Sequence, residues 1–136
     1  MKRDRVAVVA LVLLTAGCGR SHQKEVGSDT PIAGAEDCGK KPAFVQLYAD
    51  AKVMLCSANR SDATGKDSGT IIYTSPAAPA AVLGWSKAEA VKAGLAEQLS
   101  TPESFSASEG DRRTLMVLAA PQGTGSQITL NWSRER

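Results

Sequence analysis

The C-terminal part of the chain alternates between apolar and polar side chains, and this pattern constrains the fold more than any other feature. Its apolar positions are Ile128, Leu130 and Trp132, and its polar positions are Thr129, Asn131 and Ser133. Successive side chains of a β-strand point to opposite faces, so this segment has one buried and one solvated face. Such a strand belongs to an antiparallel sheet that is covered on one face only.

Other segments predict further strands and one helix. Apolar and β-branched runs predict strands at residues 51–56, 70–74, 104–108 and 113–120. Residues 44–48 are a further short strand or an approach segment, and residues 57–69 have the composition of a loop. Pro79 suits the first turn of a helix over 80–93, which Gly94 can end. The order β-β-α-β-β-β predicts an α+β fold, with a four- to five-stranded antiparallel sheet and one helix packed on a face.

The expected helix carries apolar residues on two opposite sides. One side has Val82, Leu83, Ala90 and Ala93, and the other has Trp85, Ala88, Val91 and Leu95. Only one side can pack on the sheet, so the other is either covered by a loop or exposed to solvent. An exposed apolar side marks an interaction site, which makes the second set a candidate partner face. In that case Trp85→Ala lowers partner capture without unfolding the domain.

The N-terminus has the pattern of an export signal. Lys2, Arg3 and Arg5 precede the apolar run 6–14, and small residues follow. A helix needs about 20 apolar residues to cross a bilayer, so this run is too short to span one. The pattern predicts export of the chain and disfavours an uncleaved membrane anchor.

The segment Thr15-Ala16-Gly17-Cys18 resembles the lipobox of bacterial lipoproteins. The resemblance implies that the Cys18 thiol receives diacylglycerol, that the signal peptide 1–17 is removed, and that the new amine is acylated, commonly with palmitate. Several acyl chains anchor a protein firmly, since each buried methylene contributes about 0.8 kcal/mol. Thr15 stands where this family usually has a large aliphatic residue, which keeps an ordinary secretory signal as the alternative. Gly19, instead of a retention aspartate, favours the outer membrane over the inner one.

The remainder of the chain resembles small α+β domains of bacterial envelope lipoproteins, whose activity is unassigned. The segments that carry this resemblance are residues 48–53, the Thr-Ser-Pro sequence at 74–76 and residues 127–132. It implies a fold and no particular activity.

Between the lipobox and the expected domain lies a polar segment without periodicity. Residues 18–37 are therefore predicted to be a lipid-anchored flexible tether, and residues 38–136 to form one small α+β domain. The whole chain has 16 basic and 14 acidic residues. Removal of residues 1–17 takes away three basic residues and one acidic residue, which leaves 13 basic and 13 acidic residues. With no net charge and only 4% aromatic residues, the mature chain is not expected to bind nucleic acid.

Two cysteines, Cys38 and Cys56, remain once Cys18 is assigned to the lipid. In an oxidising compartment an even pair favours a disulfide, which would pin the end of the tether to the first core strand. A zinc site is the alternative, but two cysteines without nearby histidines supply too few ligands. A redox dithiol is disfavoured because the Cys-x-x-Cys arrangement is absent.

The sequence offers few groups for catalysis. The one histidine, His22, lies in the tether without an orienting partner, and the carboxylates show no distinctive pairing. Lys40-Lys41 and Arg112-Arg113 have the character of ordinary loop charges. We therefore expect no catalytic residues, no metal site and no cofactor.

The expected protein is a lipid-anchored component of the bacterial envelope that faces the periplasm. Its small domain is expected to be a non-catalytic interaction or accessory module with an envelope protein as its partner. The alternative is a lipoprotein that binds a small ligand in the periplasm, in a pocket between helix and sheet. An enzyme that uses loop carboxylates is a third, weaker hypothesis.

Overall fold

The computed structural model describes residues 35–136 of the chain. They form η1 (Ala35–Lys40), β1 (Lys52–Ser61), β2 (Lys66–Ser75), α1 (Pro79–Lys92), β3 (Ala96–Ser100), β4 (Ser104–Glu109), β5 (Arg113–Gln122) and β6 (Gly125–Glu135). The predicted signal peptide 1–17, the lipidation site Cys18 and the part of the tether up to residue 34 lie outside the described residues.

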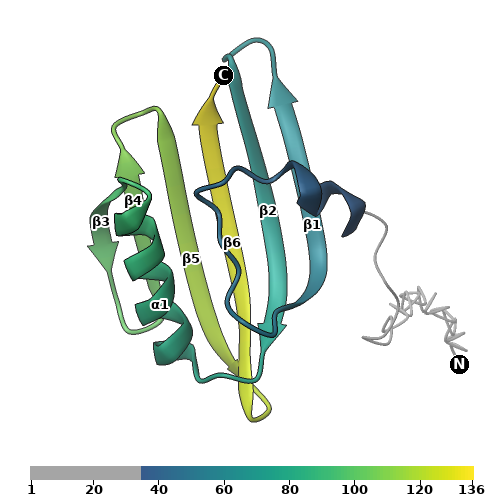
Figure 1. Cartoon of the computed structure of the whole chain (residues 1–136), viewed down its shortest axis with the longest axis vertical. Helices are drawn as coiled ribbons and strands as arrows, with labels where there is room; N and C mark the ends of the chain where they lie inside the picture. Colours follow the sequence, from purple (N-terminus) through teal and green to yellow (C-terminus); the bar gives the residue numbers. More distant parts are fainter. Residues whose placement is uncertain (1–34) are drawn as a thin grey trace, which may run out of the picture.

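The strands form one antiparallel sheet in the order β1-β2-β6-β5-β4-β3. Strands β3 to β6 follow one another as a meander, and the β1–β2 hairpin joins it through the pairing of β2 with β6 (Figure 1). Strand β6 therefore lies inside the sheet with a neighbour on each side. The sequence predicts its alternation correctly: Ile128, Leu130 and Trp132 are all less than 5% exposed.

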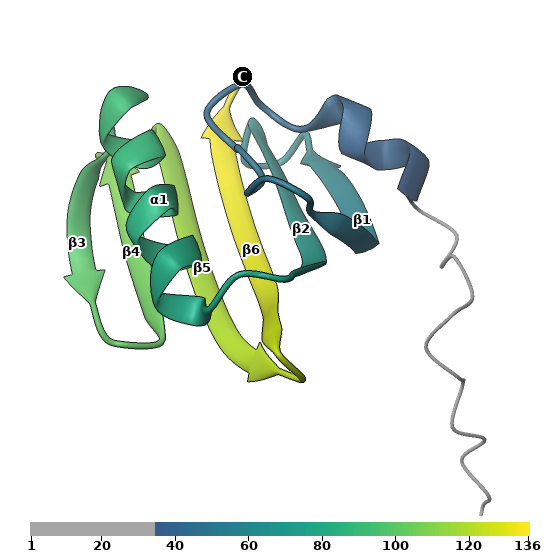
Figure 2. The same ribbon diagram turned by 60° about the horizontal axis from the view of Figure 1, so that its bottom comes forward.

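Two segments cover the same face of this sheet (Figures 1 and 2). Helix α1 lies over β5 and β4. The segment 41–51, which we call the cover segment, crosses the β6, β2 and β1 half and buries Phe44 and Val45. The core lies between these two covers and the sheet, and its largest fully buried side chains include Tyr73 and Phe105.

The general α+β architecture, a helix on an antiparallel sheet, is confirmed, but the sheet has six strands and not four to five. The extra strand is β3, which pairs with β4 at one edge of the sheet. All five of its residues are exposed, and its sequence, AEQLS, contains no β-branched residue. Neither burial nor intrinsic propensity marks such an edge strand in the sequence, so pairing with β4 alone determines its conformation.

The prediction of a loop over 57–69 was wrong. Strands β1 and β2 continue through this region and leave only residues 62–65 as the turn of a hairpin. The polar residues that suggested a loop are ladder positions, such as Asn59 opposite Ser68. Residues 44–48 form no strand and belong to the cover segment.

Helix α1 begins at Pro79 as predicted. Its buried apolar residues, Val82, Leu83 and Ala90, all belong to the first of the two predicted sides, and Ser86, which was assigned to neither side, is also buried. The helix ends in a Schellman motif, in which Gly94 has φ of 84°. The Gly94 N–H donates to the Val91 carbonyl at 2.9 Å, and the Leu95 N–H donates to the Ala90 carbonyl at 3.0 Å. This motif turns the chain so that Leu95, which follows the helix, enters the core at 2% exposure.

The predicted disulfide is present between Cys38 of η1 and Cys56 of β1. Cys56 lies in the core with 3% exposure, next to Ile71 in the register of the sheet. The bridge thus attaches the start of the described chain to the outer strand of the sheet, as the cysteine count suggested.

Candidate functional site

A hollow of about 490 Å³ opens at the end of the sheet where β1, β2 and β6 meet η1. We call it the Trp132 hollow, and its lining residues are Lys40, Ala58, Asn59, Arg60, Asp67, Trp132 and Arg134. The register explains why these residues gather. Arg60 is opposite Asp67 across β1 and β2, and Asp67 is opposite Arg134 across β2 and β6.

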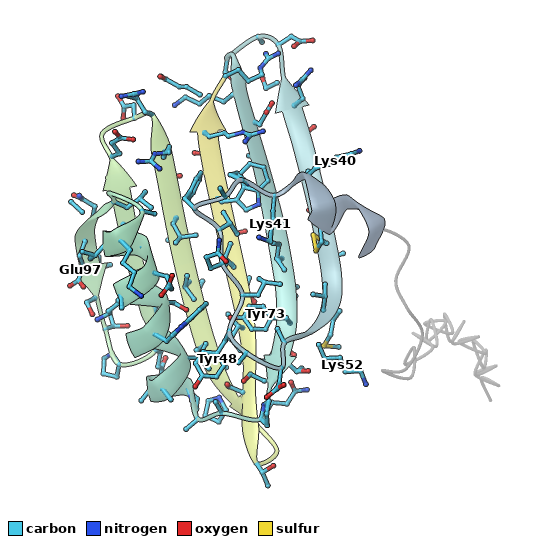
Figure 3. The ribbon with its side chains drawn as sticks, viewed as in Figure 1. Lys40, Lys41, Tyr48, Lys52, Tyr73 and Glu97 are labelled. Carbon is cyan, nitrogen blue, oxygen red and sulfur yellow. A yellow bond between two sulfur atoms is a disulfide. The ribbon has the colours of Figure 1, made fainter. Side chains whose placement is uncertain are left out.

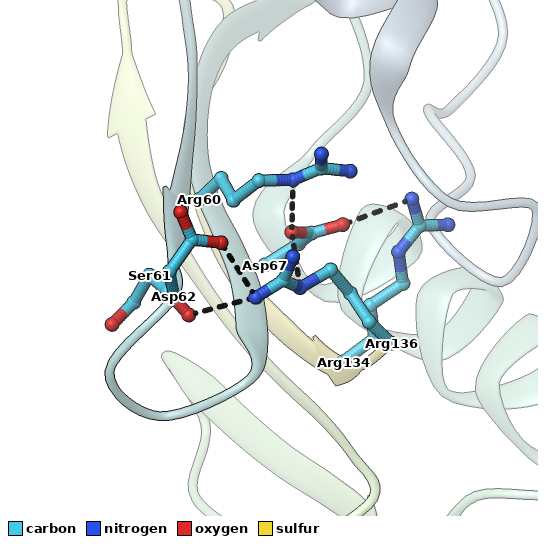
Figure 4. A network of polar contacts seen from close by, with 6 residues as sticks. All are labelled: Arg60, Ser61, Asp62, Asp67, Arg134 and Arg136. Atoms are coloured by element: carbon cyan, nitrogen blue, oxygen red, sulfur yellow. Dashed lines mark hydrogen bonds and ion pairs between the residues drawn. The ribbon is translucent and has the colours of Figure 1, made fainter.

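The carboxylate of Asp67 is the centre of an ion-pair network (Figure 4). Asp67 Oδ1 lies 3.4 Å from Arg60 Nε and 3.6 Å from Arg136 Nε, and Asp67 Oδ2 lies 3.3 Å from Arg134 Nη2. The Asp67 side chain is 11% exposed, whereas those of Arg60 and Arg134 are 66% and 40% exposed. A nearly buried anion therefore orients guanidinium groups that reach the surface.

The indole of Trp132 is a second buried polar group beside the hollow. Trp132 is 4% exposed, and its Nε1–H has no hydrogen-bond acceptor among residues 35–136. The indole lies against Gly69, because a Cβ placed on that glycine would be 2.6 Å from Trp132 Cε2 and Cζ2. Nε1 is bonded to Cε2, so the N–H belongs to the ring edge that lies over Gly69. Gly69 is opposite Ala58, which lines the hollow.

A neighbouring hollow of about 370 Å³ shares Arg134 with the first one. In it, Arg113 Nε donates to Glu109 Oε2 at 2.6 Å, and Arg112 lies 3.5 Å from the same carboxylate. The hydrogen bond from Arg113, together with the positive charges of both arginines, lowers the pKa of Glu109. The Arg113 guanidinium also lies 5.5 Å from the centre of the Phe44 ring, which ties this end of the sheet to the cover segment.

Within the described region, no helix or segment covers the other face of the sheet, which we call the open face (Figures 1 and 2). Leu99, Met116 and Leu118 lie on it with 59%, 46% and 41% exposure. Leu99 and Met116 belong to one transverse row, since each is opposite Ser106 of β4. Hydroxyl and amide groups fill other positions, and Thr70 donates to Asn131 Oδ1 at 2.7 Å.

Aromatic side chains form a cluster between helix α1 and the cover segment, and Tyr48 and Tyr73 of this cluster are labelled in Figure 3. The Tyr48 and Trp85 rings meet edge to face at 5.3 Å, and the Tyr73 hydroxyl accepts a hydrogen bond from the Tyr48 N–H at 3.4 Å. Burial raises the pKa of Tyr73 above 10.0, although the hydrogen bond from Tyr48 and an interaction with Ser86 oppose the shift. The Ser86 hydroxyl is buried and, within the described part of the chain, has no partner in good hydrogen-bond geometry.

The candidate partner face on α1 is divided between surface and core. Val91 is 64% exposed and Ala88 is exposed, while Trp85 is half-buried against Tyr48. Leu95 is in the core, so its inclusion in an exposed face was wrong. The helical angle does not apply to Leu95, because the helix ends at Lys92 and the chain reverses at Gly94.

Sequence reasoning missed the Trp132 hollow altogether. The error follows from the loop predicted at 57–69, because only a hairpin brings Arg60 and Asp67 opposite each other. One signal was available in the sequence: Gly69 directly precedes the strand-forming run 70–74, and a glycine in a strand often marks the close approach of another group. That group is the Trp132 indole.

Residues 35–136 contain no helix long and apolar enough to cross a membrane. The same residues hold no cluster of three His, Cys, Asp or Glu side chains arranged to bind a metal ion. No protein-family model matches the chain, and searches of curated proteins and of solved structures gave no significant match. The function must therefore be argued from the surfaces described above.

Proposed function

We propose that this chain is a lipid-anchored protein of the bacterial envelope whose folded domain binds a partner protein and has no catalytic role. The lipobox-like segment ending at Cys18 supports the anchor. The disulfide between Cys38 and Cys56 supports export, because such bonds persist in the periplasm and are rare in the cytosol.

The open face is the observation that carries the binding role. Met116 and Leu118 are exposed neighbours on one face of β5, and Leu99 of β3 lies in the same transverse row as Met116, across Ser106 of β4. Exposed apolar side chains in a contiguous group mark protein contacts, whereas isolated ones do not. By comparison, the outer side of α1 offers Val91 with smaller neighbours, since Leu95 is buried and Trp85 contacts Tyr48.

Several described carboxylates already have cationic partners, which leaves fewer carboxylates that could act as a general acid or base. The pairs are Asp67 with Arg60, Arg134 and Arg136, Glu109 with Arg112 and Arg113, Glu89 with Lys92, Glu97 with Lys87, and Asp62 with Arg136. A general acid or base needs a free carboxylate beside a substrate. These pairs support a binding role over a hydrolytic one.

Site-specific photocrosslinking in intact membranes tests the proposal. A crosslinking residue at position 118, on the open face, should trap one defined partner, and the same residue at position 91, on α1, should not. Trapping at position 91 alone would move the contact to the helix, and no trapping at either position would remove the partner-binding role.

The variant Leu118→Lys adds a matched control. It should reduce capture of the partner and change the free energy of unfolding by no more than about 0.5 kcal/mol, as is usual for surface substitutions. Val91→Lys, the same kind of change at an exposed apolar position of α1, should leave capture unchanged.

The alternative function, binding of a small ligand in the periplasm, is favoured by one observation. The Trp132 hollow has a volume of about 490 Å³, and one of its lining residues, Trp132, has a buried N–H without an acceptor in the described part of the chain. Its position, at the end of the sheet beside η1, differs from the pocket between helix and sheet that the sequence suggested.

A further inference from the structure

We propose that the Trp132 hollow binds a small molecule that carries a carboxylate or phosphate group on a short apolar body. This inference rests on the ligand-binding alternative above and names the chemical class of its ligand. It does not depend on the lipid anchor or on a partner protein at the open face.

The first observation is the indole donor. Nearly all buried N–H groups in folded proteins have an acceptor, so a buried one without a partner requires an explanation. The Trp132 N–H has no acceptor among the described residues, although it belongs to a residue that lines a hollow. Nε1 itself has almost no exposed surface, so a bound oxygen atom can accept this N–H only if the indole edge turns toward the hollow.

The second observation is the excess of positive charge. The lining sets two guanidinium groups, those of Arg60 and Arg134, against one carboxylate, that of Asp67, and Lys40 is a further cation that has an interaction of its own. Arg60 and Arg134 each use a single nitrogen toward Asp67, and a guanidinium group has five N–H donors. In Figure 4 the terminal nitrogens of Arg60 point away from Asp67. The arginines can thus hold an oxyanion while Asp67 keeps them in position.

The third observation concerns the size and the walls of the hollow. Its volume of about 490 Å³ is within the range of small-ligand sites, which is roughly 300–1,000 Å³. The Ala58 side chain and the Trp132 ring supply apolar surface beside the charged groups. A ligand with an anionic head and a short apolar body fits this combination better than a bare inorganic ion does.

A buried water molecule is the competing explanation for the Trp132 N–H, since water commonly satisfies such groups. The two explanations differ in a measurable way. A water molecule gives no response to added anions, whereas a ligand site responds in a saturable manner to the anion that fits it.

Nuclear magnetic resonance of the full mature protein distinguishes them, because each tryptophan gives its own indole N–H signal. The chain has two tryptophans, and Trp85→Phe assigns their signals. The probes are butyrate, propyl phosphate, inorganic phosphate and the neutral analogue butyramide. We expect a saturable shift of the Trp132 signal with butyrate or propyl phosphate, weaker binding of inorganic phosphate, no response to butyramide, and a constant Trp85 signal.

The outcomes separate the proposal that the hollow binds a ligand from the proposal that this ligand is an anion. If butyramide shifts the Trp132 signal as strongly as butyrate, the hollow binds small molecules and the anionic class is wrong. If no probe shifts the signal, ligand binding in this hollow is also refuted. A larger effect of propyl phosphate than of butyrate identifies a phosphate ligand, and the reverse order identifies a carboxylate.

Two variants test the role of the arginines. Arg134→Gln should weaken butyrate or propyl phosphate binding by about tenfold or more, as expected for loss of a charged hydrogen bond. Arg112→Gln removes the same charge from the neighbouring hollow and should have little effect. Equal weakening by both variants would indicate diffuse attraction and would overturn the site. If Arg134→Gln does not fold, Arg60→Gln, whose side chain is 66% exposed, replaces it.

Discussion

Gly69 shows how one residue shapes the end of the sheet. Its missing side chain leaves room for the Trp132 indole, which packs directly on the β2 backbone. The same contact holds the indole beside Ala58 and the Asp67 network. The hollow therefore depends on a residue that carries no functional group.

The variant Gly69→Ala tests this dependence. The new Cβ would lie 2.4 Å from the Ser57 carbonyl oxygen and 2.6 Å from the Trp132 ring, so the backbone or the indole must move. We expect a loss of about 1–3 kcal/mol in the free energy of unfolding, which is the usual cost of overpacking. Urea denaturation measures it.

Gly84→Ala is the matched control, because a Cβ at this exposed position of α1 has no atom within 4 Å. It should stabilise the protein by about 0.5–1 kcal/mol, since alanine is the better helix former. Equal effects of the two variants would contradict the packing of Trp132 on Gly69.

Tyr73 gives a second prediction at this scale, through the pH dependence of stability. Burial raises the pKa of Tyr73 in the folded protein above 10.0, the value for the unfolded chain. Above pH 10 the unfolded state loses this proton while the folded state keeps it. The free energy of unfolding therefore falls as pH rises from 10 toward the folded pKa, by up to about 1.4 kcal/mol per pH unit.

Comparison with Tyr73→Phe isolates this contribution from those of other groups. Denaturation curves between pH 9 and 11 should show a smaller decrease for the variant than for the parent protein, with both measured in the same buffers. Identical slopes would mean that Tyr73 ionises equally easily in the folded and unfolded states.

At the scale of elements, the sheet is closed by two different covers. Helix α1 packs through its own apolar side, whereas the cover segment has no regular structure and is attached at both ends. The disulfide holds η1, just before the segment, to β1, which begins just after it. The covalent bond thus compensates for the lack of regular hydrogen bonding in this cover.

Reduction of the bridge between Cys38 and Cys56 should accordingly destabilise the protein. The two cysteines are separated by 18 positions, and closing a loop of about this length contributes about 3 kcal/mol on the chain-entropy model. Denaturation with and without dithiothreitol measures the difference. The double variant Cys38→Ala, Cys56→Ala should be as unstable as the reduced protein and insensitive to dithiothreitol, and a reductant effect on it would point to another cause.

The elements also show which parts of the fold the sequence can predict. Strands β5 and β6 and helix α1 have strong local signals, namely alternation, a proline start and a glycine end, and all three were predicted. Strand β3 and the continuation of β1 and β2 lack such signals, because β3 is exposed throughout and the continuation consists mainly of polar residues. Their structure comes from hydrogen-bond pairing with neighbouring strands, which the side chains of these segments do not signal.

At the scale of the whole molecule, two surfaces of the sheet differ in chemical character. One end concentrates arginines around Asp67 and the Trp132 indole, and the open face presents apolar and hydroxyl side chains. The sequence predicted the disulfide from the cysteine count, but not the arginine network, because that network requires β1, β2 and β6 to be in register. A binding role at either surface places the protein's function on the folded domain, and the proposed anchor would serve to locate it.

The central claim, that the chain is a lipid-anchored envelope protein, depends on Cys18. Intact-mass and peptide analysis of the protein purified from cell membranes tests it most directly. The account predicts a polypeptide that begins at Cys18, carries diacylglycerol and a further acyl chain there, and contains oxidised Cys38 and Cys56. A polypeptide that retains residues 1–17, or whose Cys18 is unacylated, would contradict it.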